Sequence, residues 1–172
     1  MTKPKAHLIG GTIISNDSEA FSLFEKSRFG EKVSGKIHYM LSEALYLIEK
    51  NKISLIQGKK ELSFEQAIAK LKTKDKKVQT KYAVYKDLRD KGFVPKTALK
   101  FGADFRVYDK GDKPGDEHAR WIVFADNERN KLTWQDFSAK NRVAHSTKKK
   151  LLLAIVDEEF DVTYYEVDWI KL

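Results

Sequence analysis

The spacing of apolar side chains predicts helices in the first half of the chain. Residues 18–30, SEAFSLFEKSRFG, predict a helix that ends at Gly30. Another helix is expected from Ser63, because Gln66 follows three residues later, as in a capping box. The segment YMLSEALYLIEKNKI, residues 39–53, has an apolar stripe at helical spacing, formed by Leu41, Ala44, Leu45, Leu47 and Ile48. Together with a short apolar strand and glycine turn in HLIGGTIIS, residues 7–15, these helices predict a small α/β unit with a scaffolding role.

The second half alternates helix and strand signals. An amphipathic helix over 82–93, ended by Gly92, precedes a strand in ALKFGADFRVY and a buried strand over 119–126. Thr133 stands three residues before Asp136, which predicts an N-cap and a helix over 133–148. LLLAIVD and DVTYYEVDW, joined by EEF, predict a hairpin. This order favours a compact domain with a mixed sheet, so the fold class is α/β (α+β).

A lysine-rich segment separates the two halves. Residues 70–81, KLKTKDKKVQTK, hold six lysines and no apolar pair that could anchor them. We therefore place the domain boundary here, with an N-terminal domain over 1–80 and a C-terminal domain over 81–172. A solvated helix end is the alternative interpretation of the same segment.

Charge indicates the kind of partner. The 172 residues include 33 basic and 25 acidic side chains, a formal charge of +8, which favours a polyanion and a nucleic acid before a membrane. A lysine-rich surface is also typical of proteins that work at high temperature.

Composition also excludes several classes of chemistry. No run of about 18 apolar residues occurs and MTKPKAHLIGG lacks a signal-peptide stretch, so we expect a soluble, cytoplasmic protein with no membrane partner. The absence of cysteine excludes disulfides and thiol nucleophiles. The four histidines match no common metal motif, so no metal or other cofactor is expected. They are His7, His38, His118 and His145.

A tyrosine and a histidine flank the most loop-like segment. The strand-like FRVY ends at Tyr108 and continues into DKGDKPGD, after which His118 follows. Because rigid scaffolds usually present their chemistry on loops, this pair is a candidate site.

Longer segments resemble a known family. YKDLRDKGFVPKTALKFGADFRVYDKG, RVAHSTKKKLLLAIVD and DVTYYEVDW are similar to the catalytic domain of the archaeal tRNA-splicing endonucleases, and YMLSEALYLIEKNKI is similar to their N-terminal domain. The resemblance implies that Tyr108, His118 and Lys149 are the catalytic residues. Three consecutive lysines make Lys148 the alternative to Lys149.

The resemblance also implies a reaction. Tyr108 would act as the base on a 2′-hydroxyl, His118 as the acid for the 5′-oxygen that leaves, and Lys149 as the electrostatic stabiliser, giving a 2′,3′-cyclic phosphate and a 5′-hydroxyl. Histidine is suited to proton donation because its reference pKa is about 6.5, whereas tyrosine, near 10, needs a neighbouring cation to become a base.

The implied substrate is a bulge-helix-bulge in precursor tRNA. Arg142 lies seven residues before Lys149, two helical turns away, and is one expected half of a clamp on a bulge base; Trp169 or Tyr164 is the other. The resemblance also implies a homotetramer, or a heterotetramer with a related subunit. The loop expected to dock on a neighbouring subunit, ADNERNKL, is only weakly acidic.

Two other functions stay open from the residues alone. The chain could be a noncatalytic RNA-binding or structural subunit. It could also be a metal-dependent nuclease that uses carboxylates such as Asp104 and Asp157, since compact mixed sheets host those enzymes as well.

Overall fold

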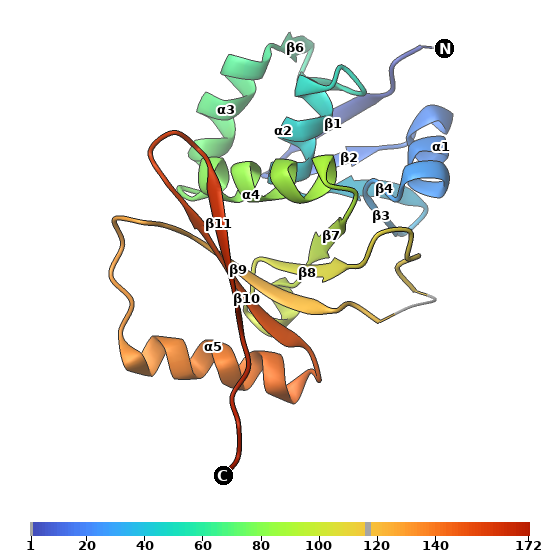
Figure 1. The fold of residues 1–172 in the computed structure, drawn as a ribbon. Helices are drawn as coiled ribbons and strands as arrows, with labels where there is room; N and C mark the ends of the chain where they lie inside the picture. The colour runs from blue at the N-terminus through green and yellow to red at the C-terminus, as the bar shows by residue number, and fades with distance from the viewer. Residues whose placement is uncertain (1, 116–117) are drawn as a thin grey trace. The chain divides into compact units, whose positions relative to one another are not determined.

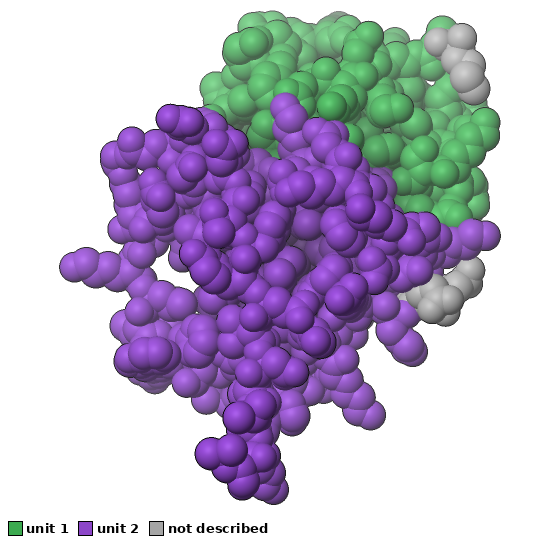
Figure 2. Space-filling model, in the orientation of Figure 1, with its two compact units in different colours: residues 1–82 green, residues 83–172 purple. Residues whose placement is uncertain are grey.

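A computed structural model describes residues 2–115 and 118–172 of the chain. The chain divides into two compact units, residues 1–82 and 83–172 (Figure 2). Each unit has a mixed or largely antiparallel sheet with helices packed on it, so the fold is α+β, as predicted (Figure 1). That residues 1–80 and 81–172 fold as independent domains stays a prediction. None of the helices in the described ranges is long and apolar enough to cross a membrane.

The first unit contains a six-stranded sheet in the order β3-β4-β2-β1-β5-β6, in which only β1 and β5 are parallel. Its strands are β1 (Lys5–Ile9), β2 (Thr12–Ser15), β3 (Glu31–Val33), β4 (Lys36–Tyr39), β5 (Ser54–Gln57) and β6 (Lys60–Leu62). Its own helices are α1 (Ser18–Ser27), α2 (Leu41–Glu49) and α3 (Phe64–Lys72).

The predictions for this unit were right where a local signal existed. Ser63 caps α3, since its hydroxyl accepts a hydrogen bond from the Gln66 backbone N–H at 3.2 Å. HLIGGTIIS forms two strands rather than one, and β3 to β6 were not predicted. Helix α1 ends at Ser27, before Gly30, because Arg28 already adopts a left-handed φ of 62°. Gly30 is required for a different reason: a Cβ there would lie 2.4 Å from the Ile37 side chain.

The second unit contains a five-stranded sheet in the order β11-β10-β9-β8-β7. Strands β9 and β10 are parallel and the other pairs are antiparallel, so the predicted mixed sheet is confirmed. The strands are β7 (Val94–Thr97), β8 (Phe105–Tyr108), β9 (Trp121–Asn127), β10 (Lys150–Val156) and β11 (Val162–Val167). The helices are α4 (Val78–Asp90), which crosses the division between the units, and α5 (Trp134–Ser146).

The structure of this unit differs from the predictions at three places. Only the last four residues of ALKFGADFRVY form a strand, because residues 99–101 make a 3-10 turn that ends at Gly102 with a φ of 74°. Strand β7 was missed because Pro95 disfavours a strand, although proline is tolerated at the edge of a sheet, where β7 lies. The helix predicted over 133–148 ends at Ser146, and its N-cap Thr133 is confirmed.

The two helices of this unit define two faces of the sheet. Ile122 and Leu151 pack with Ala144 of α5, on what we call the α5 face. The ring of Phe105 lies 6.1 Å from that of Tyr85 of α4, on the opposite α4 face. Because successive side chains in a strand alternate, Arg106 and Tyr108 point to the α5 face.

Candidate active site

Three strand ends meet at one end of the second sheet. Val107 pairs with Trp121, and Trp121 pairs with Lys150 on its other side. Extending these registers by one residue places Tyr108 of β8 and Lys149, just before β10, on either side of Arg120. Since neighbouring strands lie about 4.8 Å apart, the Cα atoms of Tyr108 and Lys149 are about 10 Å from each other. His118 precedes Arg120 by two residues and so lies in the segment that enters the sheet at this same end.

Tyr108 is anchored by apolar contacts. It is 5% exposed and forms a cluster with Val94 of the paired strand and with Ala119. Ala119 is the residue that follows His118, so the tyrosine packs against the segment that carries the histidine.

His118 itself is exposed. A histidine that is neither buried nor part of a strand or helix is available to an external ligand, which fits a site better than a core position. Residues 116 and 117, at the end of the predicted glycine-rich loop, lie outside the described residues.

The three consecutive lysines have different environments. Lys148 is exposed and adopts a left-handed φ of 56°, at the point where the chain turns back after α5. The backbone N–H groups of Lys148 and Lys149 donate to His145 and Ala144, which is the Schellman arrangement at the end of a helix. Lys150 is in β10 and its Nζ lies 3.1 Å from a Glu166 carboxylate oxygen.

Lys149 is affected by the positive charges of two other side chains, Arg106 and Lys100. Its side chain is half-buried, and its Nζ donates to the Thr147 carbonyl oxygen at 3.1 Å. Desolvation, and then the charges of Arg106 and Lys100, lower the pKa of Lys149. We call Lys100, Arg106 and Lys149 the basic cluster. A phosphate or other anion bound near these side chains would offset the repulsion among them.

A separate cavity of about 350 Å³ contains the two predicted clamp residues, Arg142 and Trp169. The ring of His145 lies 4.3 Å from that of Trp169. The cavity is lined by Phe137, Ser138, Asn141, Arg142, Val167, Asp168 and Trp169. Leu151 pairs with Val167, so continuing that register by two residues places Trp169 level with Lys149.

The structure changes two expectations about the clamp. Helix α5 ends at Ser146, so Arg142 and Lys149 do not share a helical face, and only the turn at Lys148 brings them to one end of the sheet. Tyr164 pairs with Ala154 on the α4 face and donates from its hydroxyl to Asp87 at 2.7 Å. Burial, followed by this hydrogen bond, raises the pKa of Tyr164. Trp169 is therefore the aromatic residue placed beside Arg142.

Asp104 and Asp157, the carboxylates that a metal-dependent nuclease could use, accept hydrogen bonds from backbone N–H groups. Asp104 accepts a hydrogen bond from the Ala125 N–H at 2.8 Å. Asp157 accepts from the N–H groups of Glu159 and Asp161, both at 2.9 Å, within the turn between β10 and β11. In residues 2–115 and 118–172, no group of three or more histidine, aspartate or glutamate side chains is placed to hold one metal ion.

Sequence reasoning missed Arg106 and Lys100. Arg106 could have been found, because it stands two residues before Tyr108 in the same strand and so shares its face. Lys100 could not, because it lies in a 3-10 turn that was predicted to be a strand.

Each of the two units matches a domain of a known protein family. Residues 78–164 match the model of the tRNA intron endonuclease, catalytic C-terminal domain, and residues 5–68 match that of the tRNA intron endonuclease, N-terminal domain. A tRNA-splicing endonuclease of Thermococcus gammatolerans is 43% identical over 96% of this chain and 97% of its own length. Those of Pyrococcus furiosus and Methanothermobacter thermautotrophicus are 42% and 40% identical, over 96% and 92% of this chain and over 95% and 92% of their own lengths.

The chain therefore belongs to the tRNA intron endonuclease family. It is an enzyme, and its second unit carries most of the segment that matches the catalytic domain of the family. The resemblance inferred from the sequence is confirmed.

Proposed function

We propose that this chain cleaves precursor tRNA at intron boundaries within bulge-helix-bulge motifs, by transesterification that needs no metal ion. One observation supports the proposal: by strand register, Tyr108, the segment of His118 and Lys149 lie at the same end of one sheet, and Lys149 is a member of the basic cluster. Membership of the family supports a tRNA precursor as the RNA.

The proposed reaction uses one proton acceptor and one proton donor. The phenolate form of Tyr108 takes the proton of the 2′-hydroxyl and becomes the neutral phenol, and the 2′-oxygen forms a bond to the adjacent phosphorus. The bond from phosphorus to the 5′-oxygen breaks, and His118 gives that oxygen a proton. Lys149 stabilises the additional negative charge of the phosphorane between these steps. The products are a 2′,3′-cyclic phosphate and a 5′-hydroxyl.

Recognition is proposed to occur in the cavity beside the reaction. Bulge bases are unstacked and can lie on a guanidinium plane or an aromatic ring. Arg142 offers the first and Trp169 the second, and both line the same cavity. Phe137 adds a further ring and Asn141 an amide for hydrogen bonding, so the cavity suits a flat heterocycle.

A symmetric assembly is proposed because a bulge-helix-bulge has two cleavage positions and each chain has one site. We expect a homotetramer, or a heterotetramer with a related subunit. In the loop expected to dock, Asp126 accepts hydrogen bonds from Asn127 and Asn130. Glu128 is exposed, so its carboxylate is more accessible to a neighbouring subunit than that of Asp126. Glu128→Lys, alone or with Asp126→Lys, should shift tetramers to dimers in light scattering. A wild-type chain that stays monomeric would refute the assembly.

Single-turnover cleavage of a minimal bulge-helix-bulge RNA tests the reaction. With excess chelator, the wild-type chain should keep its activity, and His118→Ala should be about 100-fold slower or more with an unchanged RNA dissociation constant. His7→Ala is the control, since His7 is also exposed but lies in β1 of the first unit. Loss of activity in chelator favours the metal-dependent alternative, and absence of cleavage under every condition favours the RNA-binding subunit.

The nucleophile has its own test. A single 2′-deoxy nucleotide at the cleavage position should abolish cutting there and leave binding unchanged. Cleavage of this substrate would rule out attack by the 2′-oxygen.

A further inference from the structure

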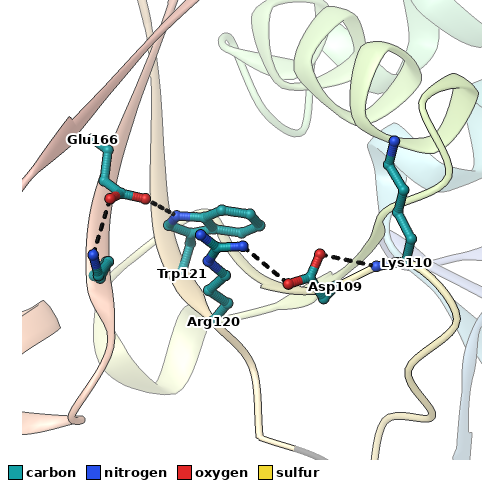
Figure 3. A network of polar contacts seen from close by, with 6 residues as sticks. Asp109, Lys110, Arg120, Trp121 and Glu166 are labelled. Carbon is teal, nitrogen blue, oxygen red and sulfur yellow. Dashed lines mark hydrogen bonds and ion pairs between the residues drawn. The ribbon is translucent and has the colours of Figure 1, made fainter.

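Polar contacts join residues of β9, β10 and β11 near the proposed site, and two residues next to β9 and β8 extend them (Figure 3). Arg120 contacts the Asp109 carboxylate at 3.0 Å. The indole N–H of Trp121 donates to one Glu166 oxygen at 2.7 Å, and Lys150 lies 3.1 Å from the other. The hydrogen bonds from Trp121 and then Lys150 lower the pKa of Glu166.

Aromatic packing fixes the centre of this chain of contacts. The guanidinium carbon of Arg120 lies 4.4 Å from the centroid of the Trp121 ring. Phe93 meets the same indole edge-on, with the centroids 5.5 Å apart. Trp121 is 8% exposed, so its ring is fixed by Arg120, by Phe93 and, at its nitrogen, by Glu166.

Four of the five residues in these contacts, all except Glu166, lie within three residues of a proposed catalytic residue in the sequence. Asp109 follows Tyr108, and Lys150 follows Lys149. Arg120 and Trp121 are the second and third residues after His118. Side chains that are adjacent in a strand point to opposite faces, so Lys150 reaches Glu166 on the α4 face while Lys149 is on the α5 face, near enough to Arg106 for its charge to lower the pKa of Lys149.

We propose that Arg120, Trp121 and Glu166 are positioning residues, which hold the start of β9, and with it His118, in place between Tyr108 and Lys149. This inference rests on the proposed function. The ion pairs involved have side chains that are 38–50% exposed, and exposed pairs contribute little to the stability of a fold. Their effect on geometry can be larger, since a displacement of about 1 Å at a catalytic group can slow a reaction about 100-fold.

Glu166 gives the sharpest test because it lies on β11, which β10 and β9 separate from β8, and is not itself a proposed catalytic or RNA-binding residue. Glu166→Ala should slow single-turnover cleavage about 10-fold, with an RNA dissociation constant within about twofold of wild type. Glu166→Gln keeps an oxygen that accepts from the indole and should recover most of the rate. Glu61→Ala is the control, because it removes an exposed carboxylate paired with Lys3 and raises the net charge equally.

A double-mutant cycle separates positioning from general damage. If Glu166 acts through His118, Glu166→Ala should slow the His118→Ala enzyme by less than about twofold, because there is no imidazole left to place. A loss through folding or assembly would multiply in both backgrounds. Equal factors in the two backgrounds, or a wild-type rate for Glu166→Ala, would overturn the inference. Failure of the wild-type chain to cleave, or a fully active His118→Ala, would instead refute the proposed function.

Discussion

Replacing the three consecutive lysines one at a time tests the assignment of the catalytic cation. Lys148→Gln, Lys149→Gln and Lys150→Gln each remove one charge from adjacent positions, so they weaken the general attraction to RNA equally. Lys149 is near enough to Arg106 and Lys100 for their charges to lower its pKa, and Arg106 points to the same face of the sheet as Tyr108. The three variants therefore differ in geometry and not in net charge.

The expected magnitudes follow from these environments. Lys149→Gln should lower the single-turnover rate about 10²–10³-fold, or about 3–4 kcal/mol, as for the loss of one transition-state donor. Lys148→Gln should stay within about twofold of wild type, because that side chain is exposed at the turn. Lys150→Gln should cost a few-fold, through its contact with Glu166. The assay is cleavage at saturating enzyme, with the RNA dissociation constant measured in parallel.

Either of two results would refute the assignment of Lys149. If Lys148→Gln is the slow variant and Lys149→Gln is active, the positive charge acts from the exposed turn and the basic cluster has no part in the reaction. Equal losses in all three variants would show that only the summed charge matters.

Three further predictions concern pH and stability. The pKa of Lys149 is lowered, so its positive charge is present below that pKa and is lost above it, and the cleavage rate should fall at a pH below the ordinary lysine value of 10.5. Arginine stays charged to higher pH, so in Lys149→Arg this fall should move to higher pH. A pH–rate profile that does not move would contradict the assignment of Lys149. Lys148→Gly should stabilise the chain by about 0.5–1 kcal/mol in denaturant unfolding, because glycine relieves the left-handed φ of the Schellman turn; destabilisation would argue against that conformation. Gly30→Ala should destabilise by about 2–5 kcal/mol, from its positive φ and from the overlap of the new Cβ with its neighbours. The control Gly35→Ala has a similar φ but nothing within 4 Å, so it should lose only about 1–2 kcal/mol in the same unfolding experiment, and equal losses would exclude the overlap.

Local signals in the sequence predicted the elements that depend on local physics. The caps Ser63 and Thr133 were found because each satisfies backbone N–H groups within its own first turn. The hairpin of β10 and β11 was found because its two strands are close in sequence. Strand β7 was missed because of Pro95, and strands β3 to β6 were missed because each depends on pairing with neighbours that sequence periodicity does not identify.

The candidate site was only partly predictable for the same reason. The pair of Tyr108 and His118 could be singled out from a strand followed by a loop. Lys149 came from the family resemblance, and the helical spacing used to relate it to Arg142 was wrong, because a left-handed lysine at 148 carries no sequence signal of the kind that glycine gives. Whether Trp169 or Tyr164 is the aromatic half of the clamp depends on which face of the sheet each side chain occupies. The register of β11 against β10 determines that face, and the sequence does not show this register.

The parallel strands β9 and β10 have a consequence for how the site is charged. Open sheets with parallel strands usually bind anions at the carboxyl ends of the strands, where helix N-termini bring about half a positive charge. Here His118 and Lys149 precede β9 and β10, so the proposed site lies at the amino ends, and α5 ends close to it, three residues before Lys149. The negative end of the helix dipole opposes a phosphate, and the Lys149 ammonium lies on a carbonyl oxygen of that end. Attraction for RNA must therefore come from side chains such as Arg106 and Lys149, and the binding of a phosphate at this site should weaken steeply with added salt.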